Sequence, residues 1–171
     1  MQDFLATIEG SGIATWVRES PSIFAYTTVL SLHAMGLAVV VGTSTVIALR
    51  LLGFARGIPI GQLLKLYPIM WIGFTVNAIS GLLLLAANAS GMLANSAFIV
   101  KMGLILVAMI VMELMRHRIT ADAAYDNPGS AAASAPTRAL GVAAMIVWAG
   151  VIIAGRLTAY PNFLSSLLGL G

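Results

Sequence analysis

Long runs of apolar residues alternate with short polar segments along this chain. Four of these runs are long enough for a helix that crosses the hydrocarbon core of a membrane, which takes about 20 residues. The runs cover residues 23–49, 68–87, 97–114 and 140–160. Ser20 and Pro21 precede the first run and are residue types that favour the N-cap and the first position of a helix. The pattern therefore predicts four membrane-spanning helices.

The first twenty residues follow a different pattern. Apolar residues such as Phe4 and Trp16 are interleaved with charged residues such as Asp3 and Glu9. This arrangement is typical of a short amphipathic helix on the membrane surface, and we expect an interruption near residues 10–12. Because the segment lacks the basic start of a signal peptide, we expect it to remain part of the protein.

Composition supports lipid as the solvent of this chain. Hydrophobic residues make up 60% of the sequence and charged residues only 9%, with a mean hydropathy of +0.98. A soluble domain carries roughly 25% charged residues, so this chain has too few to cover a surface exposed to water. We predict an all-α fold, a polytopic membrane four-helix bundle with a short N-terminal amphipathic interfacial helix, as a single transmembrane domain over residues 1–171.

Charge and cysteine content narrow the function classes. The sequence contains no cysteine, which excludes disulfides, thiolate metal sites and covalently attached haem of the c type. The net charge of +3 is concentrated in loops, so no nucleic-acid partner is expected. The expected partners are membrane lipid and other membrane components.

The basic loops predict an orientation. Lysine and arginine accumulate in cytoplasmic loops, and the connections between spans one and two and between spans three and four are basic. These residues are Arg50, Arg56, Lys65, Arg116, Arg118 and Arg138. We therefore expect a bacterial inner (cytoplasmic) membrane protein with both termini outward. The third connection, about residues 120–138, is rich in Ala, Ser, Pro and Gly and is predicted to be a flexible cytoplasmic linker.

Three ionisable residues fall within the apolar runs in the predicted outer half of the membrane: His33, Lys101 and Arg156. Such residues are costly in lipid and indicate a functional site by default. The acidic residue within a predicted span, Glu113, lies near the opposite end, so the two cations lack a carboxylate at their depth. An anionic ligand would compensate them. Haem carries two propionates and an iron that binds histidine.

The helical face of His33 suits a flat ligand. Residues at helical spacing share this face, namely Tyr26, Leu30, Gly36, Leu37 and Val40. Gly36 would let a macrocycle approach the backbone closely. In the second span a stripe of small and polar residues follows Asn77, Ser80, Gly81 and Asn88. That stripe also fits close packing between two helices.

Glu113, Arg116 and His117 have a different setting. They form i, i+3 and i, i+4 pairs at the cytoplasmic end of the third span, which is typical of a solvated helix end. Lys101 and His117 are separated by roughly 24 Å along the helix, so His117 lies well below His33. We therefore do not expect both histidines to ligate one iron.

Three stretches resemble known membrane proteins. They are "GLAVVVGTSTVIALRLLG" after His33, "NSAFIVKMGLILVAMIVM" around Lys101, and the final "WAGVIIAGRLTAY" containing Arg156. They resemble a family of small, uncharacterised bacterial four-helix membrane proteins. The histidine-then-lysine arrangement is also similar to HemJ-type protoporphyrinogen oxidases and, more loosely, to CopD copper-resistance proteins. By resemblance to HemJ, His33 is expected to bind haem and Lys101 to be essential to the site.

These observations lead to a first functional hypothesis, a b-type haem protein. His33 ligates the iron, Lys101 and Arg156 hold the propionates, and Gly36 and Tyr26 border the macrocycle. Met102 or Lys101 itself is a candidate second axial ligand. The protein would take electrons from quinol or oxidise a porphyrin in the manner of HemJ, so its place among oxidoreductases stays open.

Two further hypotheses fit the same residues. A CopD-like protein would transport copper or a small ligand, with His33 and nearby methionines as ligands. A structural subunit would use its polar residues to anchor partner chains, with Lys101 and Arg156 extending to the headgroups and His33 hydrogen-bonded to a neighbouring helix. Four short helices make a thin bundle, so we expect a homo-oligomer or a partner membrane subunit.

Overall fold

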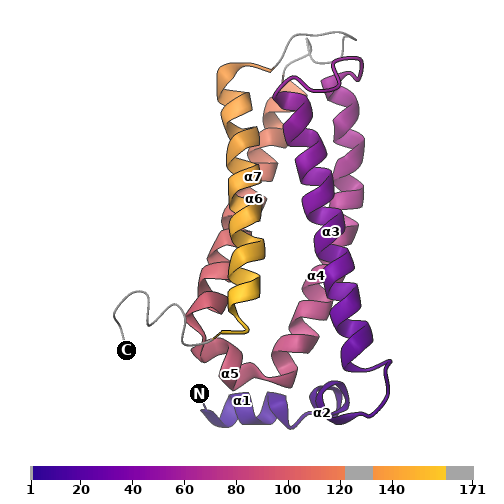
Figure 1. The fold of residues 1–171 in the computed structure, drawn as a ribbon, viewed down its shortest axis with the longest axis vertical. Coiled ribbons are helices and arrows are strands. Elements are labelled where there is room, and N and C mark those ends of the chain that lie inside the picture. Colours follow the sequence, from indigo (N-terminus) through magenta and orange to yellow (C-terminus); the bar gives the residue numbers. More distant parts are fainter. Residues whose placement is uncertain (1, 122–132, 161–171) are drawn as a thin grey trace.

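The computed structural model describes residues 2–121 and 133–160, and every regular element in these ranges is a helix. Two short helices, α1 and α2, precede three long helices, α3, α4 and α6, with a 3-10 helix (η1) before α4 and a short α5 after it; a fourth long helix, α7, follows (Figure 1). Their bounds are α1 Gln2–Glu9, α2 Gly12–Glu19, α3 Tyr26–Leu51, η1 Ile60–Lys65, α4 Leu66–Ala87, α5 Ala89–Ala94, α6 Ser96–Ala121 and α7 Ala135–Leu157.

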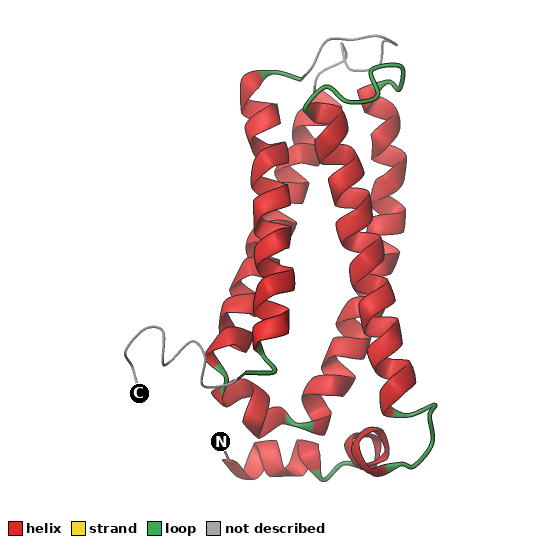
Figure 2. Cartoon of the chain, viewed as in Figure 1, coloured by secondary structure: helices red, strands yellow, loops and turns green. Residues whose placement is uncertain are grey.

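The prediction of an all-helical chain with four potential spans is confirmed for these residues. Four segments are long and apolar enough to cross a membrane. They are Tyr26–Leu51, Ile60–Ala87, Ser96–Ala121 and Ala135–Leu157. Turns and loops are confined to the two ends of the long helices (Figure 2).

The helix ends differ from the predicted spans. Helix α6 continues to Ala121, because Glu113 and Arg116 form an i, i+3 ion pair that supports the helix beyond its apolar part. Helix α7 begins at Ala135 with a proline in its first turn, where the missing N–H is not needed. Residues 120–121 and 135–138 of the predicted linker are therefore helical, and residues 122–132 lie outside the described residues.

The N-terminal segment forms two helices, separated where the sequence predicted an interruption. The break falls at Gly10 and Ser11, and the Ser11 hydroxyl accepts a hydrogen bond from the Ala14 N–H at 3.4 Å as the N-cap of α2. Both helices lie across one end of the long helices (Figure 1). We call this end of the molecule the covered end.

The long helices pack as two pairs, α3 with α4 and α6 with α7, and α3 also packs on α7. The pairs diverge toward the covered end (Figure 1). At the opposite end, which we call the packed end, four large interior side chains are at most 1% exposed, namely Ile47, Leu51, Met112 and Met115. The core cluster of the molecule therefore lies toward the packed end.

Candidate functional site

Helix α3 presents His33 to helix α4 through a defined hydrogen-bond network. His33 Nδ1 lies 3.0 Å from the Asn77 carbonyl oxygen and 3.3 Å from Ser80 Oγ. The carbonyl only accepts, and Ser80 Oγ donates its hydrogen to the Val76 carbonyl at 2.6 Å. Nδ1 must therefore carry the hydrogen, and in the neutral ring Nε2 keeps a free lone pair.

The small residues of α4 provide the seat for this imidazole. A Cβ atom on Gly81 would lie 3.0 Å from His33 Cε1 and 3.3 Å from Nδ1, so the ring packs directly on the backbone of α4. In the reverse direction, Asn77 Nδ2 donates to the His33 carbonyl at 2.7 Å. The predicted polar stripe of the second span thus positions His33, whereas Asn88 lies apart at the corner between α4 and α5.

His33 borders two adjoining cavities at the covered end, of about 690 and 280 Å³. Residues that line both cavities are His33, Leu84, Met92, Lys101 and Thr158. The larger cavity is bordered by polar residues of the two helices at the covered end, Glu9 of α1 and Arg18 of α2, and by Asn88. The smaller cavity has mainly apolar walls from α4 and α6, among them Phe74, Leu82, Leu85, Phe98 and Ile105. The space therefore has a charged part and an apolar part.

Lys101 extends from α6 along the wall of both cavities. Its Cε and Nζ atoms lie 3.6 and 3.7 Å from the position of a Cβ on Gly155, so the side chain crosses to α7 over a glycine. Within the described residues the ammonium has no hydrogen bond or ion pair. An anionic group bound in the cavity would compensate the charge of this ammonium.

Arg18 is a second cation at the larger cavity, and sequence reasoning missed it. Its Nη1 donates to the carbonyls of Ala87 at 3.2 Å and Glu9 at 3.4 Å, and its Nε and Nη2 donate to Glu19 at 3.2 and 2.8 Å. The residue was assigned to a surface helix, and the docking of that helix over the cavity depends on tertiary contacts. Its signal in the sequence, a basic residue beside an acidic one, is too common to single it out.

Glu9 connects α1 to Ser90 of α5. Its carboxylate accepts hydrogen bonds from the Ser90 N–H and hydroxyl, both at 2.7 Å. These hydrogen bonds, first that from the backbone, hold the pKa of Glu9 below its ordinary value. Glu9 and Arg18 together therefore attach α1 and α2 to the corner between α4 and α5.

The predicted site residues are only partly brought together. Tyr26 borders the larger cavity with His33 and Lys101, and it is half exposed. Gly36 is buried against α4, where an added Cβ would lie 2.7 Å from the Asn77 nitrogen, so α4 occupies the space expected for a macrocycle. Arg156 is exposed near the end of α7, whereas its neighbours Gly155 and Thr158 border the larger cavity. Arg18 is among the residues that line this cavity, and Arg156 is not.

The donor atoms at the cavities limit the metal chemistry. Among residues 2–121 and 133–160, no three His, Cys, Asp or Glu residues are grouped as a metal site. Met92 and Met102 border the smaller cavity together with His33. No family model, curated protein sequence or solved structure matches the chain. The chemistry of the site is therefore inferred from its own residues.

Proposed function

We propose that this protein is a four-helix membrane bundle of the bacterial inner membrane that binds a b-type haem between its helix pairs and transfers electrons. His33 Nε2 would bind the iron, and Lys101 and Arg18 would compensate the charges of the propionates. The observation that carries this proposal is the hydrogen-bond network of His33, which commits Nδ1 to α4 and leaves Nε2 as the ring nitrogen available to the cavity.

The residues present fit a haem in three respects. A metal-binding histidine usually donates its second ring N–H to a carbonyl or carboxylate, as His33 does to Asn77. Haem needs few protein ligands because the porphyrin supplies four nitrogens, which agrees with a site that has a single imidazole. The cavities of about 690 and 280 Å³ lie near the range of about 300–1,000 Å³ that is usual for cofactor sites.

The polarity of the walls suits the same ligand. Phe74, Leu82 and Ile105 would exclude water from the macrocycle, and Lys101 would compensate a carboxylate at the charged end. A bound b-type haem supplies a one-electron couple whose potential depends on axial ligation and burial. Quinol and porphyrinogen are the electron donors to assay, since each is expected from the membrane location or from the resemblance to HemJ.

One observation favours a second candidate, a copper site. His33, Met92 and Met102 border the same cavity and offer one nitrogen and two thioether sulfurs. Soft sulfur donors favour Cu(I). In this alternative the protein would bind or transport copper, as the CopD resemblance implies.

A reduced-minus-oxidised absorbance spectrum of the protein purified from haem-replete cells tests the proposal. We expect a sharp α-band that is lost in His33→Ala. The chain contains two histidines, so His117→Ala on the exposed end of α6 is the matched control and should keep the band. Far-UV circular dichroism establishes that both variants remain helical.

The outcomes separate the candidates. Absence of a Soret band from the wild-type protein would reject the haem proposal. Copper that copurifies with the wild-type protein, and is lost with His33→Ala, would then support the second candidate. A protein with neither haem nor copper would have the structural role that the sequence also allows.

A further inference from the structure

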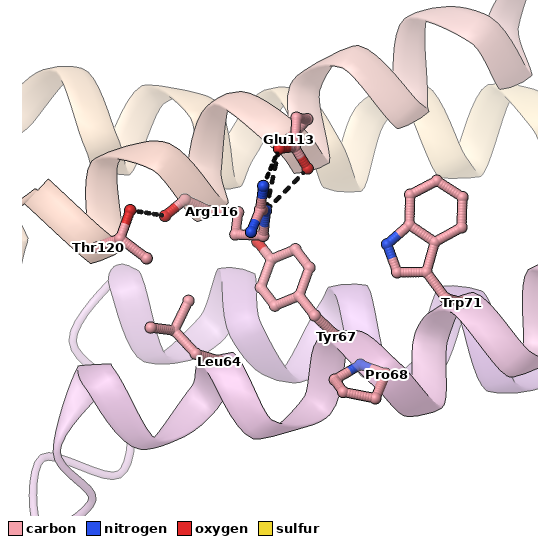
Figure 3. Close-up of a pocket in the computed structure, with 7 residues that line it drawn as sticks. All are labelled: Leu64, Tyr67, Pro68, Trp71, Glu113, Arg116 and Thr120. Carbon is pink, nitrogen blue, oxygen red and sulfur yellow. Dashed lines mark hydrogen bonds and ion pairs between the residues drawn. The ribbon is translucent and has the colours of Figure 1, made fainter.

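A third cavity, of about 640 Å³, lies near the packed end between the start of α4 and the last part of α6 (Figure 3). It is bordered by Tyr67, Pro68 and Trp71 from α4 and by Glu113 and Arg116 from α6. None of its lining residues borders the cavities at His33. The residues that line this cavity are therefore separate from those of the proposed haem site.

The cavity offers charges of both signs side by side. Glu113 and Arg116 form an ion pair in which Nε donates to both carboxylate oxygens, at 3.0 and 2.9 Å, and Nη2 donates as well. Both side chains are nearly half exposed, 43% for Glu113 and 45% for Arg116. Within the described residues Nη1 keeps its two N–H groups, and the carboxylate keeps room for another donor. The pair can thus bind an anion and a cation at once.

Two aromatic residues shape the opposite wall. Tyr67 is buried and donates its hydroxyl hydrogen to the Met112 carbonyl at 3.0 Å, which fixes the ring. Trp71 is 46% exposed and packs edge-to-face on Phe74, with ring centroids 5.6 Å apart. In Figure 3 the indole nitrogen of Trp71 lies on the side of the ring that faces the ion pair. Tryptophan is enriched at the level of lipid headgroups.

An apolar strip leads from this cavity along the facing sides of α4 and α6. The helices pair tightly as α3 with α4 and α6 with α7, which leaves α4 and α6 without a comparable contact in the described part of the chain. Leu106 lies two helical turns before Glu113 and therefore on the same face of α6. From Glu113, this face leads toward the apolar cavity walls formed by Phe74 and Ile105. Leu106 is 64% exposed. The surface is therefore polar at one end and apolar beyond it.

We propose that this surface binds a zwitterionic phospholipid with a primary ammonium, of the phosphatidylethanolamine type. The ammonium donates to Glu113, and the phosphate accepts from Arg116 Nη1 and from the Trp71 indole. The acyl chains follow the apolar strip. A zwitterion compensates both charges of the pair. An anionic headgroup would be repelled by the Glu113 carboxylate, and a trimethylammonium group has no N–H to donate to it.

Native mass spectrometry of the delipidated protein tests this lipid selectivity. The protein is incubated with phosphatidylethanolamine, phosphatidylcholine and phosphatidylglycerol that carry identical acyl chains. We expect phosphatidylethanolamine to bind about tenfold more tightly than phosphatidylcholine, as one charge-assisted hydrogen bond would give. The measurement does not need haem, so its result is independent of the proposed function at His33.

Variants test the role of the ion pair. Glu113→Gln removes the negative charge, so the preference for phosphatidylethanolamine should disappear and phosphatidylglycerol should bind more tightly than before. Arg118→Gln is the matched control, because Arg118 is exposed on the same end of α6 but does not border the cavity. It should leave the preference unchanged, and circular dichroism establishes that both variants are folded. Equal binding of the three lipids to the wild-type protein, or a preference that survives Glu113→Gln, would overturn the inference.

Discussion

The packed end and the covered end are built from the same four long helices but have different interiors. At the packed end, Ile47 and Met112 are at most 1% exposed and belong to the core cluster that joins the helix pairs. At the covered end, His33 and Lys101 border cavities of about 690 and 280 Å³. The comparison shows that two ionisable residues inside apolar helices, His33 and Lys101, lie beside the cavities of the covered end. The packed end contains most of the apolar core, and its ionisable pair, Glu113 and Arg116, is nearly half exposed.

The largest expected effect on this difference comes from the contact that holds α3 against α4. Gly36→Ala places a Cβ 2.7 Å from the Asn77 nitrogen and 2.8 Å from the Gly73 oxygen, so one helix backbone must move. Overpacking of this kind costs about 1–3 kcal/mol of unfolding free energy. Gly42→Ala is the matched control, since nothing lies within 4 Å of its Cβ. Unfolding of both variants in detergent, followed by circular dichroism, measures the difference; equal stabilities would contradict the close approach.

A smaller effect is expected when only the seat of His33 changes. Gly81→Ala places a methyl group 3.0 Å from His33 Cε1, which displaces the ring from its hydrogen bond to Asn77. Loss of such an orienting contact weakens metal binding by about 10–100-fold. Titration of haem into the purified protein measures the affinity that we propose, with Gly103→Ala on α6 as the control that meets nothing within 4 Å. Unchanged affinity in Gly81→Ala would show that the seat does not position the ligand.

The smallest expected effect concerns the attachment of the covering helices. The folded-state pKa of Glu9 lies below its ordinary value of 4.5, so its contribution is present above that value and is lost as the pH falls through the lowered pKa. Hydrogen exchange in α1 and α2 should therefore accelerate in acid relative to α3. Glu9→Gln should exchange faster already at neutral pH and lose this acid dependence. An acid response that persists in Glu9→Gln would assign it to another group.

The long helices could be predicted from the sequence because each of them contains a continuous run of apolar residues. His33 and Lys101 were recognised for a related reason: a titratable residue in such a run stands out without any knowledge of packing. Arg18 and Arg156 show the limit. Helices that are apolar on most sides give no indication of their rotation, so the exposure of Arg156 was not predictable. The position of Arg18 depends on how a surface helix docks, which is set by contacts with residues far along the chain.

The glycines illustrate the same distinction. Gly36 was expected to let a macrocycle approach, and the structure uses the same lack of a side chain to bring α4 close. The spacing of residues along the first span identified Gly36 as a point of close approach to the backbone, but it did not show that α4 would be the neighbour there. The end of α6 differed for a simpler reason. The apolar run gives way to polar residues from Glu113 onward, whereas the helical hydrogen bonding continues to Ala121.

The attachment of α1 and α2 also orders events during synthesis. Glu9 binds Ser90, which lies 81 residues later in the chain. Helices α1 and α2 leave the ribosome before α3, α4 and α5, so they cannot reach their final position until those helices have followed them. Until then the larger cavity beside His33 lacks the part of its border formed by Glu9 and Arg18, and a ligand that entered in that interval would be enclosed by helices made before α4 and α5.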